Sequence, residues 1–303
     1  MDLDKERLIP QWAAWAINQQ LQVMIGSAHG GVGLRHVKRA EVESLAMTMP
    51  PLSEQRRITA IVAEKMAAVE RARVATEAQI KAAKALPAAY LRAEFESEEA
   101  QQWPRVRLTE VLLDVRNGIY KPDEFYGTGT RILKMFNIGR MDGTWSLSRI
   151  DKVRLGHEEE RLYVLHPGDI LMNRVNSREL VGKCAVVDYF AAGAVFESKN
   201  MRLRLNLAMA FPTYVAAFLN SAYGRQQIDQ RVRQIVGQAT INRSDLDSIE
   251  IPLPTVDEQA RHASRLGSRF AMAADLNRRL DERLADMKAL SPALLRGAFS
   301  GKL

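Results

Sequence analysis

A short polar segment, residues 173–178, carries side chains that can bind the edges of DNA bases. Its sequence is Asn-Arg-Val-Asn-Ser-Arg. An arginine guanidinium can donate two parallel hydrogen bonds to guanine, and an asparagine amide can pair in the same bidentate way with adenine. Two further segments, 199–200 (Lys-Asn) and 238–243 (Gln-Ala-Thr-Ile-Asn-Arg), are similar in composition. Each segment alone is typical of a solvated turn, but three of them in one basic region favour a duplex-binding surface.

The candidate DNA-contacting residues come from these three segments and from nearby polar positions. They are Lys121, Lys134, Asn137, Asn173, Arg174, Asn176, Ser177, Arg178, Lys183, Lys199, Asn200, Gln238, Thr240, Asn242 and Arg243. Between Arg161 and Arg243 the chain has eleven Lys and Arg residues against five Asp and Glu. The whole chain has a net charge of +7 and a pI near 9.6. This balance favours an anionic partner.

The sequence has no recognisable set of catalytic residues. It lacks the Asn-Pro-Pro-Tyr or Asp-Pro-Pro-Tyr signature of amino methylation, and it has no glycine-rich cofactor loop after a strand. The five histidines are scattered, without the spacing of metal ligands. Cys184 lies in an apolar run, which is typical of a core residue rather than a nucleophile. We therefore expect a non-catalytic protein that holds no metal or cofactor of its own.

One stretch of the chain occurs twice, and this repeat shows which elements must position the polar segments. Residues 42–96 align with residues 246–300 without a gap, at a constant shift of 204 residues. We interpret the repeat as one structural unit used twice, so the residues between the copies form a separate module.

Each copy is predicted to be a long helix. Prolines precede a polar residue that can cap a helix, Ser53 or Asp257, and no further proline occurs before Pro87 or Pro292. The stretch between has roughly 35 residues, or about 50 Å of helix. Its apolar positions step by four and three, as in a coiled-coil seam. The seam positions are Val62, Met66, Val69, Arg73, Thr76, Ile80 and Ala83 in the first copy, and Leu266, Phe270, Ala273, Asn277, Leu280, Leu284 and Met287 in the second.

So narrow an apolar stripe does not hold a lone helix in water, because such helices depend on tertiary packing. The simplest partner for each helix is the other copy, in an antiparallel pair. Two helices of an ordinary bundle are the alternative. The gap-free length of the repeat and the matched polar seam positions, Arg73 and Asn277, favour the pair.

The module between the copies runs from Trp103 to about Pro254 and is predicted to be rich in strands. Its apolar runs are short and separated by Gly, Asp, Asn and Pro. We expect strands at 170–172, 181–187 and 201–207, and a closing helix from Pro212 to about Gln234. The expected fold class is α+β, with one strand-rich domain and two long helices that form an antiparallel coiled-coil spacer.

The composition fits a cytoplasmic protein. A single cysteine among 303 residues excludes an internal disulfide framework and fits a reducing compartment. The first residues are charged, so no signal peptide is expected. The chain has no apolar run long enough for a membrane span.

Taken together, these features resemble the specificity (S) subunit of type I restriction-modification systems. The order and spacing of the matching segments carry the resemblance, which covers essentially the whole chain. The segments are 167–171 (Pro-Gly-Asp-Ile-Leu), 181–183 (Val-Gly-Lys), 211–221, 237–242 (Gly-Gln-Ala-Thr-Ile-Asn) with Leu246, 249–254 (Ile-Glu-Ile-Pro-Leu-Pro), 258–259 (Glu-Gln) and 294–303.

The resemblance implies a domain order. Residues 1–50 would be the C-terminal remnant of a first target-recognition domain, because 9–18 match 211–220 at a shift of 202 residues. Residues 51–98 would be the first spacer helix, with its helical part at about Ser53 to Glu96. A complete target-recognition domain would follow at 103–254. The second spacer helix and C-terminal tail would occupy 255–303, helical from about Asp257 to Phe299.

The resemblance also implies partners. The chain would bind double-stranded DNA and read one half of a bipartite site, while its spacer helices hold methyltransferase (M) subunits. Adenine-N6 methylation and DNA cleavage would belong to partner subunits, and S-adenosylmethionine to the methyltransferase. A restriction (R) subunit is a further candidate partner, as is a second S-type polypeptide or a copy of the chain itself. The alternatives are a coiled-coil scaffold protein that binds no DNA, and a detached recognition region of a fused restriction-methylation enzyme.

Overall fold

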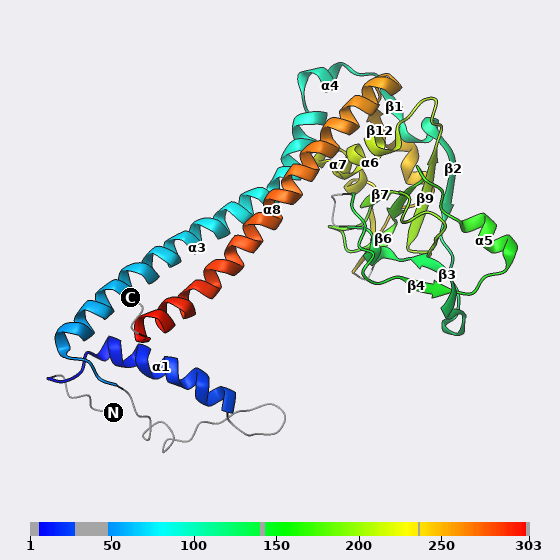
Figure 1. The fold of residues 1–303 in the computed structure, drawn as a ribbon. Coiled ribbons are helices and arrows are strands. Elements are labelled where there is room, and N and C mark those ends of the chain that lie inside the picture. The colour runs from blue at the N-terminus through cyan, green and yellow to red at the C-terminus, as the bar shows by residue number, and fades with distance from the viewer. Residues whose placement is uncertain (1–5, 28–47, 140–142, 236, 301–303) are drawn as a thin grey trace. The chain divides into compact units, whose positions relative to one another are not determined.

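The computed structural model describes residues 6–27, 48–139, 143–235 and 237–300 (Figure 1). Residues 28–47, which hold part of the implied first-domain remnant, lie outside the described residues. The chain divides into a helical unit, residues 1–84 with 275–303, and a strand-rich unit, residues 85–274. Two long helices, α3 (Leu52–Phe95) and α8 (Val256–Phe299), contribute residues to both units.

The two long helices begin slightly earlier in the chain than the sequence predicted. The residue before α8 is Thr255, whose backbone N–H and hydroxyl donate to the Glu258 carboxylate at 3.0 and 2.7 Å. This is a capping box, so Thr255 and not Asp257 is the cap. At the start of α3 the equivalent residue is Pro51, whose carbonyl accepts from the backbone N–H of Glu54. Ser53 and Asp257 both lie inside the first turn, and their predicted role as caps is wrong.

Both helices have 44 residues and continue through Pro87 and Pro292, where the proline pattern alone ended them. A proline inside a helix removes one hydrogen bond and costs about 3 kcal/mol. Beyond Pro87, however, Leu91 and Phe95 are buried in the main core. Burial of two such side chains contributes about 3–6 kcal/mol, which offsets the cost of the proline. The helix limits implied by the resemblance are therefore closer to the structure.

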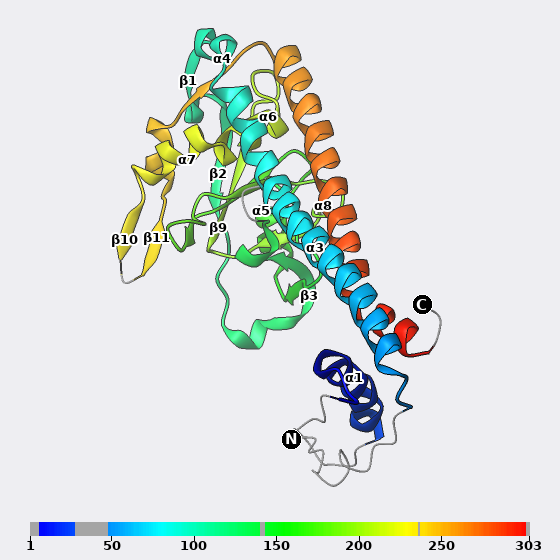
Figure 2. The same cartoon turned by 90° about the vertical axis from the view of Figure 1, so that its left-hand side faces the viewer.

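Helices α3 and α8 lie side by side and antiparallel, as both views show (Figures 1 and 2). In the strand-rich unit Arg265 donates to the Glu94 carboxylate at 2.7 Å. In the helical unit the Thr76 hydroxyl contacts the Met287 sulfur at 3.7 Å. Residues early in one helix thus meet residues late in the other. The predicted seam lies in this contact, and its buried members are Val62, Thr76, Ile80, Ala83, Leu266, Ala273 and Leu280. The predicted antiparallel pair is confirmed.

The strand-rich unit contains four small sheets. The main sheet is antiparallel, in the order β2 (Leu112–Asn117), β9 (Asn200–Leu205), β5 (Ile170–Asn173), β7 (Cys184–Val186). The three others are β4 (Asp151–Val153) with β3 (Tyr126–Leu133) and β8 (Val195–Phe196); β10 (Arg233–Ile235) with β11 (Gln238–Thr240) and β6 (Val175–Asn176); and β1 (Arg105–Arg107) with β12 (Glu250–Pro252).

The main sheet is covered on both faces. Along β5, Ile170 and Met172 pack in the core that contains α6 (Pro212–Asn220), while Leu171 packs in a second core with Phe196. All four residues of β5 are buried, which explains the continuous apolar run of its first three residues, 170–172. Three short helices complete the unit: α4 (Glu98–Gln102), α5 (His157–Tyr163) and α7 (Ala222–Asp229).

The closing helix predicted at 212–234 is two helices followed by a strand. Helix α6 ends at Asn220, and the Ser221 side chain caps α7 by accepting from the backbone N–H of Gly224 at 3.1 Å. A Cβ atom at Gly224 would lie 2.2 Å from the Phe218 carbonyl oxygen, so only glycine allows this tight connection. The predicted strand at 181–187 is shorter for a related reason, because Gly182 has a φ of 81° and ends a turn before β7 begins.

The repeat extends to a buried glutamine that holds a neighbouring segment. In the helical unit Gln55 is fully buried and makes three hydrogen bonds. Its Oε1 accepts from the backbone N–H of Ile9 at 2.9 Å. Its Nε2 donates to the carbonyls of Arg7 and Pro50 at 3.0 and 2.8 Å. These bonds fix the start of helix α1 (Pro10–Ser27).

In the strand-rich unit Gln259, the repeat partner of Gln55, makes the same three bonds. Its Oε1 accepts from the backbone N–H of Phe211 at 2.8 Å. Its Nε2 donates to the carbonyls of Met209 and Pro254 at 3.0 and 2.8 Å. Helix α1 in the helical unit is therefore the structural counterpart of α6. This equivalence supports the interpretation of the first residues as the end of a recognition domain.

An aromatic contact repeats with the glutamines. Trp12 of α1 packs on Phe299 with ring centroids 5.6 Å apart, and Tyr214 of α6 packs on Phe95 at 5.4 Å. Each pair joins the short helix to the last turn of a long one. The duplication is thus preserved in side-chain packing as well as in sequence.

Candidate nucleic-acid interface

The structure brings the three predicted polar segments together. Strand β6 of the first segment pairs with β11 of the third, with Asn176 opposite Ala239 and Val175 opposite Thr240. The backbone N–H of Arg174 donates to the carbonyl of Lys199, in the second segment, at 2.8 Å. Segments that are separated in sequence therefore form one continuous surface of the strand-rich unit.

Arg174 links all three segments. Its Nη1 donates to the Ser198 carbonyl at 3.2 Å, and its Nη2 donates to Asn242 Oδ1 at 3.1 Å. Its own carbonyl accepts from the backbone N–H of Ile241 at 3.0 Å. Because the guanidinium is half-buried and already bonded, Arg174 positions this surface, and only part of it is open to a ligand.

Two of the predicted DNA-contacting asparagines lie inside the unit. Asn173 and Asn200 are fully buried. Asn173 Nδ2 donates to the Lys199 carbonyl at 2.9 Å and to Asn200 Oδ1 at 3.0 Å. Asn176 Nδ2 in turn donates to Asn173 Oδ1 at 2.7 Å. A buried amide must satisfy its donors and acceptors within the protein. Asn173 and Asn200 therefore tether the loops in this structure, which leaves their predicted contact with DNA untested.

Asn137 and Lys183 are also internal. The Asn137 amide is fully buried and donates to the carbonyls of Ser146 and Arg149 at 2.8 and 2.7 Å. Lys183 is 6% exposed, and its Nζ donates to the Ile138 carbonyl at 2.6 Å. An ammonium group is kept at such a site only when its donors are bonded. Both side chains are bonded inside the unit, which leaves their predicted contact with DNA untested.

Lys121 and Lys134 are paired with carboxylates elsewhere in the unit. Lys121 Nζ lies 2.6 Å from Glu159, and Lys134 Nζ lies 2.7 Å from Asp151. The hydrogen bond from Lys134 lowers the pKa of Asp151. Both lysines are mostly covered, so the structure gives them a local neutralising role and leaves their predicted contact with DNA untested.

The open part of the surface is formed by the other predicted residues. Arg178, Gln238 and Arg243 are exposed, and Asn176, Ser177, Lys199, Thr240 and Asn242 are half-buried. Arg178 is bound to Asp229 by two bonds of 2.7 and 2.9 Å, and this ion pair lowers the pKa of Asp229. Both side chains are about half exposed, at 51% and 46%. Such an exposed pair is screened by water and contributes little to stability, so a phosphate can replace the carboxylate.

Arg233 is not among the residues predicted to contact DNA. It lies on β10, within residues assigned to the closing helix. The pattern that could have revealed it is Val-Arg-Gln-Ile before Gly237 and Gln-Ala-Thr-Ile after it, two alternating runs around a glycine. Gly237 has a φ of 75°, which favours glycine at this turn. Arg233 is exposed and joins the open part of the surface.

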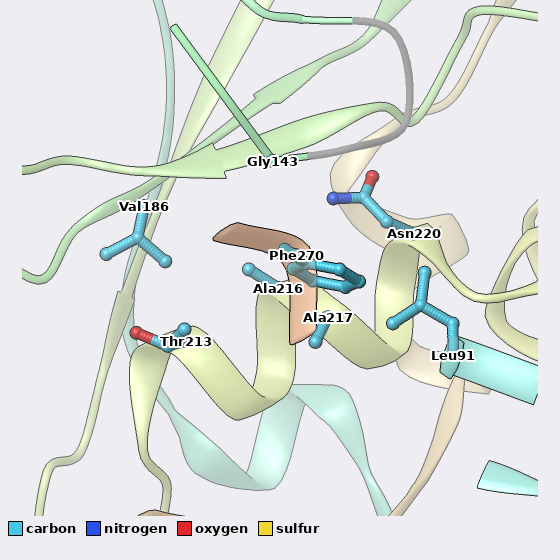
Figure 3. A pocket seen from close by; sticks show the side chains of 8 residues that line it. All are labelled: Leu91, Gly143, Val186, Thr213, Ala216, Ala217, Asn220 and Phe270. Atoms are coloured by element: carbon cyan, nitrogen blue, oxygen red, sulfur yellow. The ribbon is translucent and has the colours of Figure 1, made fainter. Parts of the chain in front are cut away.

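The strand-rich unit offers little for catalysis among its described residues. Burial raises the pKa of the Cys184 thiol to about 12, so it is not a ready nucleophile. A cavity of about 160 Å³ beside α6 is mainly apolar, and the Asn220 side chain at this cavity donates to the Cys184 carbonyl at 2.8 Å (Figure 3). In the described ranges no group of three His, Cys, Asp or Glu residues could hold a metal ion. No described helix is long and apolar enough to cross a membrane.

Two long antiparallel helices, a strand-rich unit between them in the chain and a polar cationic surface on that unit define the class of fold, a strand-rich domain with a pair of long helices. Within this class, the chain is similar to the specificity subunits of type I restriction enzymes. It is 26% identical over 297 residues to the EcoKI specificity subunit of Escherichia coli (strain K12), and 26% identical over 298 residues to the StySPI specificity subunit of Salmonella potsdam. Each match covers 92% of this chain. The resemblance predicted from the sequence is confirmed.

Solved structures of type I restriction-modification subunits are also similar to this chain. The HsdS subunit from Thermoanaerobacter tengcongensis matches all of this chain with a TM-score of 0.66 and 25% identity. A chain from a structure of type I R-M complex assembly and conformational transition matches with a TM-score of 0.76 and 26% identity. This chain covers 73% and 74% of those chains, and 62% of the two curated relatives. No family model matches the chain.

Proposed function

We propose that this chain is a DNA sequence-recognition subunit of a type I restriction-modification complex and reads one half of a bipartite site. One observation carries the proposal. Three polar segments, predicted from composition alone, are joined into a single surface on which Arg178, Gln238 and Arg243 are exposed. Similarity to specificity subunits over 92% of the chain supports the same function.

In this proposal the chain contributes binding and no chemistry. Exposed arginines contact phosphates, which sets the register on the duplex and makes the affinity depend strongly on salt. Polar side chains then read base edges in a groove. The excess of cations between Arg161 and Arg243 supplies the attraction. Adenine-N6 methylation, S-adenosylmethionine and DNA cleavage belong to partner subunits, in the cytoplasm where DNA and partners meet.

The long helices are the proposed docking elements for methyltransferase subunits. Only the seam of each helix is used by the α3–α8 contact, so the opposite faces are exposed along both helices. A restriction subunit is a further proposed partner. The strand-rich unit is one reader, and the other half-site is assigned to a second recognition domain, on a second S-type polypeptide or a second copy.

A binding experiment with the purified partner methyltransferase tests the proposal. We expect the two proteins to co-purify and their complex to select a specific duplex from a random library, with affinity that falls as salt rises. If the chain binds the methyltransferase but the complex selects no duplex, the chain is a scaffold. A chain that does neither would contradict the proposal entirely.

A further inference from the structure

The β10–β11 ribbon is the part of the open surface best suited to enter a DNA groove. Figure 2 shows both strands extending from the strand-rich unit as a two-stranded ribbon. A major groove about 12 Å wide admits a ribbon of this kind. We propose that this ribbon enters the major groove and that Arg233 and Gln238 determine specificity there. This inference rests on the proposed function.

The register of the ribbon places both residues on one face. Arg233 lies opposite Thr240, and Ile235 lies opposite Gln238. Residues opposite each other in an antiparallel pair share a face, and so do residues two apart along a strand. Arg233, Gln238 and Thr240 therefore point to the same side. Ala239, between Gln238 and Thr240, points to the other side and is fully buried in the main core.

The base of the ribbon is held firmly by the unit behind it. Ala239 pairs with Asn176 and Thr240 with Val175, so β6 forms the third strand of this sheet. Just beyond β11, Asn242 accepts from Arg174 Nη2 at 3.1 Å. The buried face and these bonds orient the outward face without help from a ligand. A preorganised reader loses less conformational entropy when it binds.

The donors on the outward face are free. Among the residues that the structure describes, the side chains of Arg233 and Gln238 form no hydrogen bond or ion pair, whereas Arg174 and Arg178 are already engaged. A free guanidinium can fork to guanine, and a free glutamine amide can pair bidentately with adenine. The chemistry of the two side chains thus assigns guanine to Arg233 and adenine to Gln238.

The spacing of the two side chains also fits DNA. Arg233 is level with Thr240, which is two residues from Gln238. Two residues of a strand span about 7 Å. Successive bases of one DNA strand are about 3.4 Å apart, so this distance corresponds to about two base steps. The guanine and the adenine are therefore expected about two positions apart in the half-site.

Site selection by the complex of full-length chain and methyltransferase tests this inference. The variants are Arg233→Ala, Arg233→Lys and Gln238→Ala, with Arg107→Ala, an exposed arginine on β1, as a matched control for loss of charge. Arg233→Lys keeps the charge but loses the planar fork. We expect Arg233→Ala and Arg233→Lys to relax selection at one guanine, and Gln238→Ala at one adenine, by about 5- to 150-fold each. Arg107→Ala should leave selection unchanged.

Two other outcomes overturn the inference while the proposed function stands. Variants that keep the full selectivity of the parent would remove the ribbon from the readout. Variants that weaken binding to all duplexes alike, with Arg233→Lys restoring it, would show contacts to phosphates only. A parent complex that selects no duplex would contradict the proposed function itself, and the two failures are therefore distinct. All of these variants change exposed side chains. Their unfolding temperatures show whether each variant keeps the fold.

Discussion

At the scale of single residues, the same amino acid types occupy exposed positions that we propose to contact DNA and buried positions that tether loops. Asn173 and Gln238 both belong to segments selected for their polar composition, yet Asn173 is fully buried and Gln238 is exposed. Composition selected segments that the structure joins into one surface, because polar groups are suited both to reading bases and to holding tight loops. It could not separate the two roles, since burial depends on contacts between 173–176, 199–200 and 239–242 that lie far apart in the chain.

Replacing Asn173 tests its role as a tether. Asn173→Ala removes the partner of Asn200 Oδ1 and of Asn176 Nδ2, so we expect a loss of about 1–3 kcal/mol in the free energy of unfolding. Gln238→Ala, at an exposed position, should change it by less than about 0.5 kcal/mol. Chemical denaturation of both variants measures the difference. Equal stabilities would mean that the buried amide network contributes nothing.

The Cys184 thiol is expected to be inert in the folded protein. Burial raises its pKa to about 12, so almost no thiolate is present at pH 8. A thiol reagent should therefore label the native chain only as fast as it opens, and the unfolded chain at once. Rapid stoichiometric labelling of the native protein would contradict the buried position of this residue.

Glu197 should make the free energy of unfolding depend on pH in a defined direction. Burial raises its pKa in the folded protein, against the hydrogen bond from the Met135 N–H, which lowers it. A carboxyl group with a raised folded pKa stabilises the fold below its unfolded pKa, and this stability is lost as the pH rises through the folded value. We expect Glu197→Gln, which keeps an acceptor for Met135, to be more stable than the parent at pH 7. The difference should vanish below about pH 4, the usual range of a glutamate pKa. A variant that is less stable at neutral pH would show the opposite sign.

At the scale of elements, the regular parts were predictable and the interruptions were not. The gap-free repeat and its coiled-coil seam extend over many residues, so they predicted the helices α3 and α8 and their antiparallel pairing. The ribbon β10–β11 was hidden because residues 212–232 begin as a true helix, and only Ser221 and Gly224 interrupt it. The prolines indicated helix ends that are too early, because the low helix propensity of Pro87 is outweighed by the burial of Leu91 and Phe95.

The duplicated glutamines provide a test at this scale. Gln55→Ala and Gln259→Ala each remove three hydrogen bonds to backbone groups. We expect each to cost about 1–3 kcal/mol for every buried group left unsatisfied, and Gln79→Ala, at an exposed position of α3, to cost nothing measurable. Hydrogen exchange locates the effect: Gln55→Ala should expose the amides of residues 8–13, and Gln259→Ala those of 209–215. Protection that is unchanged in either variant would refute the equivalence of the two contacts.

At the scale of the whole molecule, charge determines how the chain meets its ligand. The net charge is +7, and the strand-rich unit holds the three joined segments, so electrostatic attraction is expected to bring a duplex to that unit. Specific contacts then select the site. The curated relatives are longer, and this chain covers 62% of their length. In the proposed function, the one reading surface on the strand-rich unit is assigned to one half-site.

Salt titration of duplex binding measures the electrostatic part. Each phosphate neutralised by a cation contributes about −0.9 to the slope of log K against log salt concentration. Arg243 is exposed and has no hydrogen-bond or ion-pair partner among the described residues, so Arg243→Ala should reduce the slope by about 1 for all sequences. The β1 variant Arg107→Ala should keep the slope of the parent. A slope that Arg243→Ala leaves unchanged would exclude a phosphate contact at this residue.

The most direct test of the account asks which end of the main sheet faces DNA. Strand β7 runs from Cys184, beside Met172, to Val186, beside Ile170, so Tyr189 follows at the end remote from the segment at 173–178. Tyr189 is 87% exposed and Gln238 is also exposed, so a photocrosslinking amino acid fits at either position. In the complex with methyltransferase and duplex, we expect crosslinks to DNA from position 238 and none from position 189. Crosslinks from 189 alone, or from neither position in a complex that binds DNA, would contradict the proposed surface.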